Sequence, residues 1–158
     1  HYQELLVGQS TGLLIAESQK GYPILAIYEP SIEEIRAHKL NELSLYDSSD
    51  MVNQFCIDNT HGWWNKATRV GLMNSIAIER ESGRSETSIW LGDTQFVLPI
   101  EKAIDILCQL ELYALTCYNV TQGHINAIYQ LETKEEIKAY NFTTGYPRKL
   151  NFSGYPIV

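Results

Sequence analysis

Residues 90–112 have the sequence WLGDTQFVLPIEKAIDILCQLEL and connect a short β-hairpin to a long apolar helix. Gly92-Asp93 is an acceptable two-residue turn, because glycine supplies the positive φ that such turns need. We therefore predict hairpin strands over 86–91 and 94–98. Pro99 follows and suits the first turn of a helix, where the missing N–H of proline leaves no hydrogen bond unmade.

Apolar residues recur at helical spacing after Pro99 and predict a broad stripe that forms the centre of the core. Two courses stay open for this helix: it continues to Leu131, or it bends near Gly123. The predicted stripe contains Ile100, Ala103, Ile104, Leu107, Leu110 (or Glu111), Ala114, Leu115 and Tyr118.

Capping boxes mark the start of two other helices. In such a box a Ser or Thr and a Glu three residues later satisfy each other's backbone N–H groups. Ser31 with Glu34 predicts a helix that ends at Tyr46. Thr133 with Glu136 predicts a last short helix, which ends at about residue 141.

A further helix is predicted between these two, from Trp63 or Trp64 to about Ser82. Gly83 stands where a left-handed C-terminal cap would fall. Short strands are expected before it, and a turn joins the second of them to the helix. These segments are Pro23–Tyr28 and Gln54–Asp58 for the strands and Asn59–Gly62 for the turn.

The order of elements predicts an α+β fold. We expect a small, mainly antiparallel sheet that includes the 86–98 hairpin, with three to four helices packed on it. The length of 158 residues fits one domain. We divide it into an N-terminal strand segment, 1–30, joined to the core; a core domain, 31–142; and an extended aromatic tail, 143–158.

The formal net charge of −7 disfavours two classes of partner. Nucleic-acid binding depends on Lys and Arg that neutralise phosphates, and anionic membranes attract basic patches. The basic residues are scattered along the chain, so we expect neither partner. The sequence shows no signal peptide and no transmembrane segment, which predicts a soluble protein.

The sequence predicts no catalytic, metal or cofactor site. The four histidines lie far apart, without the spacing of a zinc site. The acidic pairs Glu33-Glu34 and Glu135-Glu136 fall in first helical turns, where they favour the helix dipole. The three cysteines are interpreted as reduced, buried and inert; they are Cys56, Cys108 and Cys117.

The pair Trp63-Trp64 is the candidate interaction surface. Adjacent residues on a helix point about 100° apart, so both indoles cannot face the core equally. Aromatic side chains with one wet edge recur in protein interfaces and sugar-binding platforms. The alternative is a hydrophobic staple at the helix entry, and the sequence leaves both interpretations open.

Several segments together resemble one family, the domain of unknown function numbered 4376. The resemblance covers roughly Ile35 to Phe152. Within the family, the chain is similar to the branch found in gut Bacteroidales and their prophages. It rests on Lys66–Arg69 with the helix after it, on Thr87–Leu98, on LELYALTCYNVT (110–121) and on AYNFTTGYPRKLNF (139–152).

This resemblance implies a non-enzymatic phage or prophage tail component, tail-fibre component or assembly factor that acts through other protein chains or self-association. It implies a place in the bacterial cytoplasm during assembly, or in the virion. The family has no agreed catalytic residues to carry over. Two alternatives stay open: a glycan- or surface-binding module that uses Trp63 and Trp64, and a small hydrolase.

Overall fold

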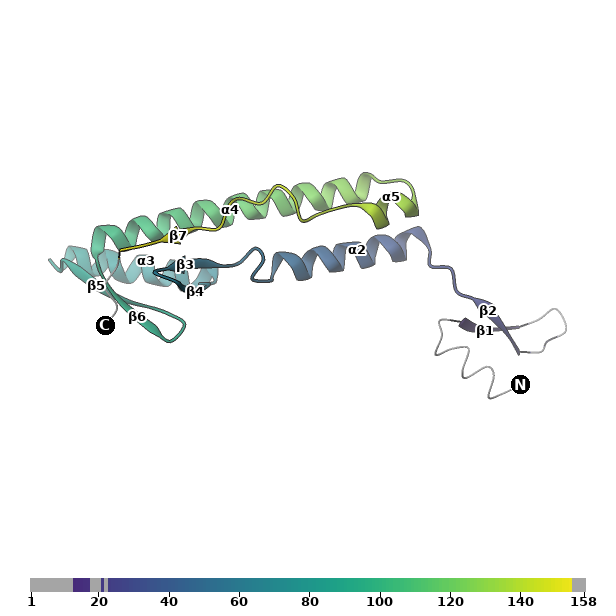
Figure 1. Cartoon of the computed structure of the whole chain (residues 1–158), viewed down its shortest axis with the longest axis horizontal. Coiled ribbons are helices and arrows are strands. Elements are labelled where there is room, and N and C mark those ends of the chain that lie inside the picture. Colours follow the sequence, from purple (N-terminus) through teal and green to yellow (C-terminus); the bar gives the residue numbers. More distant parts are fainter. Residues whose placement is uncertain (1–12, 18–20, 22, 155–158) are drawn as a thin grey trace.

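The computed structural model describes residues 13–17, 21 and 23–154 and confirms the α+β class. Its core is built from two helices that lie end to end, α2 (Ile32–Asp47) and α3 (Lys66–Glu81), and one long helix, α4 (Ile100–Gln130). At 31 residues α4 is about 46 Å long and spans the whole of this core. Figure 1 shows α2 alongside the C-terminal half of α4, and α3 beside its N-terminal end.

The strands form three small sheets among the described residues. β5 (Glu86–Leu91) and β6 (Thr94–Pro99) make the predicted hairpin, which turns at Gly92 with a φ of 62°. β3 (Phe55–Ile57) lies between antiparallel β4 (Thr60–Gly62) and parallel β7 (Asn151–Phe152). The predicted single sheet is therefore divided, and one of its pairings is parallel.

A further antiparallel hairpin, β1 (Leu13–Glu17) and β2 (Pro23–Ile27), lies beyond the N-terminal end of α2 (Figure 1). The hydroxyl of Tyr28 donates to the Glu34 carboxylate and so links this end of the chain to the first turn of α2. Residues 1–12 lie outside the described part, so the expectation that 1–30 joins the core stays a prediction.

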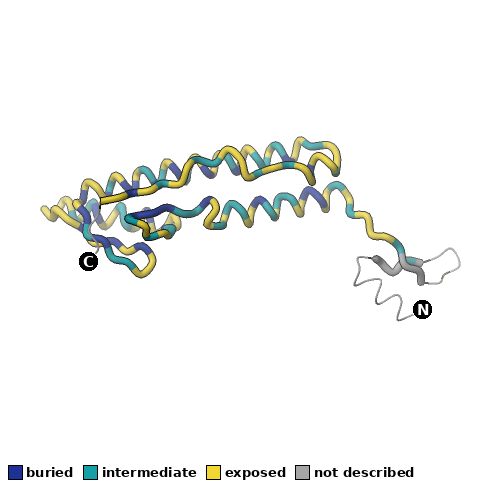
Figure 2. Tube along the Cα trace, viewed as in Figure 1, coloured by how far each residue is buried: buried dark blue, intermediate teal, exposed yellow. Residues whose placement is uncertain are grey.

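The main hydrophobic core lies where the 86–99 hairpin, α3 and the first half of α4 meet. On β5, exposed and buried side chains alternate strictly, as a strand with one covered face requires. Phe96 and Leu98 of β6 are fully buried beside them. Figure 2 shows this buried region at the hairpin end of the molecule. The largest fully buried side chains in the cluster are Phe55, Ile57, Ile76, Leu91, Phe96, Leu98, Ile106, Leu107 and Leu110.

Two predicted boundaries were wrong. The segment 59–62 is not only a turn: β4 begins at Thr60, because Asp58 and Asn59 adopt positive φ values of 42° and 68° and reverse the chain within two residues. The following helix begins at Lys66 rather than at a tryptophan. The Asn65 side chain accepts a hydrogen bond from the Thr68 N–H, which fixes the N-cap after the tryptophan pair.

Both predicted capping boxes are confirmed, at Ser31 with Glu34 and at Thr133 with Glu136. The second box opens α5 (Lys134–Ala139), which ends two residues earlier than expected. Gly83 has a φ of 83°, as the predicted left-handed cap requires. These local signals depend on neighbouring residues alone, which explains why the sequence identified them.

Helix α4 continues through Gly123 to Gln130, which decides between its two predicted courses. Its apolar stripe was predicted only in part. Ile100, Ala103, Leu107 and Leu110 are buried, but Leu115 and Tyr118 are 56% and 60% exposed. The reason is that α4 carries apolar side chains on two faces, and the other described elements cover only one of them.

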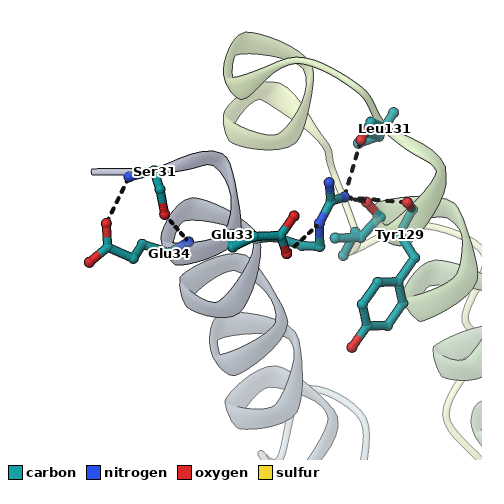
Figure 3. Close-up of polar contacts among 7 residues, drawn as sticks. Ser31, Glu33, Glu34, Tyr129 and Leu131 are labelled. Carbon is teal, nitrogen blue, oxygen red and sulfur yellow. Dashed lines mark hydrogen bonds and ion pairs between the residues drawn. The ribbon is translucent and has the colours of Figure 1, made fainter. Parts of the chain in front are cut away.

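Arg36 of α2 fixes this helix to the end of α4. Its guanidinium donates to the carbonyl oxygens of Ile128, Tyr129 and Leu131, at 2.6, 3.4 and 3.1 Å. Figure 3 shows these contacts beside the capping box at the start of α2. The last carbonyls of a helix have no partner within it, so a side chain from α2 satisfies them here.

The C-terminal segment, described to residue 154, returns alongside α4 toward the hairpin end of the molecule (Figure 1). Tyr146 packs against Tyr46 with ring centroids 5.6 Å apart, and Phe152 of β7 is buried in the main core. Tyr146 and Phe152 therefore connect the described part of the predicted tail to the core.

Candidate interaction surface

The predicted surface pair divides into one buried and one partly buried indole. Trp64 is 6% exposed, and its indole N–H donates to the carbonyl oxygen of Trp90 at 2.9 Å. Trp63 keeps partial exposure but packs edge-on against Phe55. The guanidinium of Arg69 lies over the Trp63 ring, 5.2 Å from its centroid. The described contacts of both rings are packing contacts, and any role in binding stays a prediction.

Arg69 shows how the start of α3 is fixed to α4. This buried guanidinium is paired with Glu111 at 2.6 Å and donates to the carbonyl oxygen of Trp64 at 2.7 Å. A buried cation needs such partners, because an unpaired charge in the interior carries a large desolvation cost. Arg69 is therefore explained by packing, although it belongs to a segment, Lys66–Arg69, that carries the family resemblance.

An apolar surface lies on the outer face of α4. The predicted core stripe included Leu115 and Tyr118 of this surface and left out Leu112 and Tyr129. Four large side chains on it are 56–66% exposed: Leu112, Leu115, Tyr118 and Tyr129. We call this surface, over residues 112–129, the α4 face. Exposed bands recur along this half of α4 in Figure 2. Scattered exposed apolar residues are ordinary, but large contiguous apolar patches are typical of interaction sites, which makes the α4 face the candidate surface.

The α4 face carries no formal charge. Residues 112–131 contain no Asp, Glu, Lys or Arg over 20 consecutive positions, about 30 Å of helix. The polar residues that are exposed there are amides and a hydroxyl: Thr116, Asn119, Gln122, Asn126 and Gln130. Interfaces between proteins are depleted in charged residues and enriched in tyrosine. The composition of this helix is therefore that of a contact surface.

A groove of about 340 Å³ lies beside this face and is lined only by residues of α2 and α4. Tyr118, Ile125 and Tyr129 form its α4 side, and Leu40 and Leu43 its α2 side. The polar groups at its base already have partners, because the Thr121 hydroxyl donates to Asp47 at 2.6 Å. The hydroxyl of Thr121 in turn accepts from Tyr146 at 2.9 Å.

A second polar cluster lies beneath the middle of α4. The hydroxyl of Tyr113 donates to the carbonyl oxygen of Val52 at 2.6 Å, and Cys117 lies next to it. Burial raises the pKa of Tyr113 well above its usual range, and burial also raises the pKa of the Cys117 thiol and of Tyr146. These groups stay protonated at neutral pH, which is typical of structural residues.

His124 joins α4 to the returning C-terminal segment. Its Nε2 lies 2.8 Å from the carbonyl oxygen of Thr144, and its Nδ1 lies 2.7 Å from the hydroxyl of Tyr140. A carbonyl only accepts, so Nε2 carries the proton, and in the neutral ring Nδ1 accepts from Tyr140. Both ring nitrogens are thus engaged in holding the segment.

The described residues bring together no group of three His, Cys, Asp or Glu side chains that could hold a metal ion. Every buried side-chain nitrogen or oxygen among them has a hydrogen-bond partner. The first-turn acids Glu34 and Glu136 cap their helices, and hydrogen bonds from Tyr28 and Thr133 respectively lower the pKa of each carboxyl. Glu34 and Glu136 therefore have the predicted capping role, whereas Glu33 lies 3.6 Å from the Arg36 guanidinium.

One cysteine prediction was wrong. Cys56 and Cys117 are buried as expected, but Cys108 is exposed. It lies on the opposite side of α4 from Cys117, as their nine-residue separation requires. The periodicity placed Cys108 near an apolar stripe, but the elements that cover α4 lie on the other side.

Comparison of the chain with family models, curated proteins and solved structures finds no match. The resemblance to family 4376 therefore stays a prediction. Among the described helices, none has both the length and the apolarity that a membrane crossing requires.

Proposed function

We propose that this protein is a non-enzymatic component of a phage-type tail or tail fibre, or an assembly factor for one, and that it acts through protein–protein contacts. The observation that carries the protein-binding part is the α4 face: four large apolar side chains are more than half exposed on a stretch without charge. The resemblance in sequence supports the connection to phage tails.

The exposed residues on α4 are the kind that protein interfaces use. Tyrosine supplies a large contact area and loses few rotamers on binding, and leucine adds apolar area without a desolvation cost. In water this surface would cost free energy on the order of 25 cal/mol for each Å² that stays uncovered. A partner that covers it would recover that free energy.

The test is binding of the purified protein to the tail proteins encoded with it, together with its presence in purified particles. We expect the wild-type protein to bind at least one of them, and Leu115→Glu to lose that binding. The matched control is Ile78→Glu, because Ile78 is 64% exposed on α3, away from the α4 face. The control variant should bind as the wild-type protein does.

Absence from purified particles together with no binding to any tail protein would contradict the proposal. Equal binding by the Leu115→Glu and wild-type proteins would contradict the role of the α4 face in it. The two readouts therefore separate the function from the surface that we assign to it.

A further inference from the structure

We infer that a second copy of this chain covers the α4 face, and that the two copies associate through helix-to-helix packing along α4. The inference deepens the proposed function by naming the protein that covers the α4 face. It rests on that function in one respect: tail proteins would then bind the paired copies, and Leu115→Glu would lose that binding because it separates the pair. Three properties of the face support a copy of the chain: its spacing, its area and its charge.

The first property is the spacing of the residues along α4. Positions 115, 118, 122, 125 and 129 follow steps of three, four, three and four residues, which is a heptad repeat. Four of the five are apolar or aromatic: Leu115, Tyr118, Ile125 and Tyr129. A row with a period of 3.5 residues matches another helix, because it stays in contact along the whole length of a supercoiled pair.

The fifth heptad position is Gln122, at the middle of the row and exposed. A polar residue at one such position fixes the register of paired helices at some cost in stability. The groove between α2 and α4 lies along the same row, so a helix laid on Tyr118, Ile125 and Tyr129 also meets Leu40 of α2. Two copies would thus pack face to face, each through its α2–α4 helix pair.

The second property is area. Tyr118 and Tyr129, being 58–60% exposed, each offer on the order of 150 Å². With Leu112 and Leu115, the four exposed apolar side chains offer roughly 500 Å² on one copy, more than half of the ~800 Å² that each partner contributes to an interface of standard size. The exposed amides of α4 and the α2 side of the groove lie beside these side chains and would add to that area.

The third property is charge. Each chain carries a formal net charge of −7, so two copies repel one another wherever acidic surfaces meet. Residues 112–131 contain no formal charge, so α4 brings no charge of its own to the contact. The charged residue that lines the groove is Asp47, and its carboxylate already accepts a hydrogen bond from Thr121. A partner chosen by charge would instead require basic or acidic side chains on this face.

The experiment is the solution mass of the full chain by light scattering across a concentration series. We expect at least twice the 18.0 kDa of one chain at micromolar concentrations. Leu115→Glu should weaken association by about 100-fold or more, because each copy would then bury an unpaired carboxylate. In the single chain this position is 56% exposed, so circular dichroism should show an unchanged fold.

A second variant tests whether the copies separate because a charge is buried between them or because the net charge of the chain has changed. Tyr118→Lys makes the chain less acidic, which would favour association in general, but it places a cation on the α4 face. We expect it to dissociate the copies as Leu115→Glu does. Ile78→Glu is the control, and it should keep the wild-type mass.

A mass of one chain at every concentration would overturn the inference, and so would wild-type association by either α4 variant. A monomer would leave the proposed function open, because binding to tail proteins is measured separately. Two or more copies that separate in both α4 variants, but not in Ile78→Glu, would support it.

Discussion

The Arg36 guanidinium donates to the carbonyl oxygen of Ile128 at 2.6 Å, so a side chain of α2 completes the C-terminal end of α4. Tyr129 and Leu131 supply two further carbonyl oxygens to the same nitrogen (Figure 3). The last turn of α4 contains no Lys or Arg, so the cation at this helix end comes from α2.

We expect Arg36→Met to lower the free energy of unfolding by about 2–3 kcal/mol, because hydrogen bonds from a charged donor to buried carbonyls are lost. Urea denaturation followed by circular dichroism measures this. The matched control is Arg84→Met, whose partner Glu79 lies 2.8 Å away at the surface and whose loss should cost less than about 1 kcal/mol. Equal losses would show that Arg36 has no special role.

Gly62 is in close contact with the core. A Cβ at this position would lie 3.0 Å from Cγ of Leu91, a side chain that is 1% exposed. We expect Gly62→Ala to lower the free energy of unfolding by about 1–3 kcal/mol through overpacking. Gly71→Ala should instead raise it by about 0.5–1 kcal/mol, since this glycine lies inside α3 with open space where a Cβ would stand. The denaturation midpoints of the two variants should therefore move in opposite directions.

Ionisation of Tyr113 makes the free energy of unfolding depend on pH in the alkaline range. Burial raises the pKa of its hydroxyl in the folded chain, whereas in the unfolded chain it ionises near pH 10. Its contribution is therefore complete below about pH 10 and is lost as the pH rises above that value. We expect the wild-type free energy of unfolding to fall between pH 9 and 11, as measured by urea denaturation at each pH.

Tyr113→Phe should lower that free energy by about 1–2 kcal/mol at pH 8, because the Val52 carbonyl loses its donor. Its decline above pH 10 should be less steep than that of the wild type. Burial also raises the pKa values of Tyr146 and Cys117. The variant should therefore still lose some stability above pH 10, because these two groups ionise there. Parallel pH profiles for the two proteins would contradict the assignment to Tyr113.

The cysteines should react with a thiol reagent at very different rates. Cys108 is exposed and should be labelled quickly, whereas Cys56 and Cys117 are buried and should react only as the chain unfolds. Mass spectrometry of the native protein should show one label, and three labels in denaturant. Cys108→Ser should remove the fast reaction and leave the fold unchanged. Fast labelling of all three in the native state would contradict the described burial.

Much of the local structure could be predicted from the sequence. The hairpin, the proline start of α4 and both capping boxes depend on residues a few positions apart. The boundary at Thr60 was missed, because the two positive-φ residues before it, Asp58 and Asn59, are not glycines. The parallel pairing of β3 with β7 joins residues 95 apart, for example Cys56 with Asn151, and no local pattern indicates it.

The candidate site could be predicted less well. The Trp63-Trp64 doublet drew attention by its residue types, but Trp64 is buried and Trp63 is packed under Arg69. The α4 face was merged with the core stripe, because periodicity shows that a face is apolar and not which neighbour covers it. The absence of charge over residues 112–131 was the available signal.

The parallel pairing of β3 with β7 also sets the order in which the chain folds. Cys56 cannot meet Asn151 until residue 151 has left the ribosome, and Arg36 cannot meet the carbonyl of Ile128 until residue 128 has done so. Contacts so distant in sequence carry a large loop-closure entropy and form slowly. Until they form, β3 lacks its β7 partner and its outer edge stays unpaired. Residues 151 and 152 therefore protect a strand edge that the chain made about 95 residues earlier.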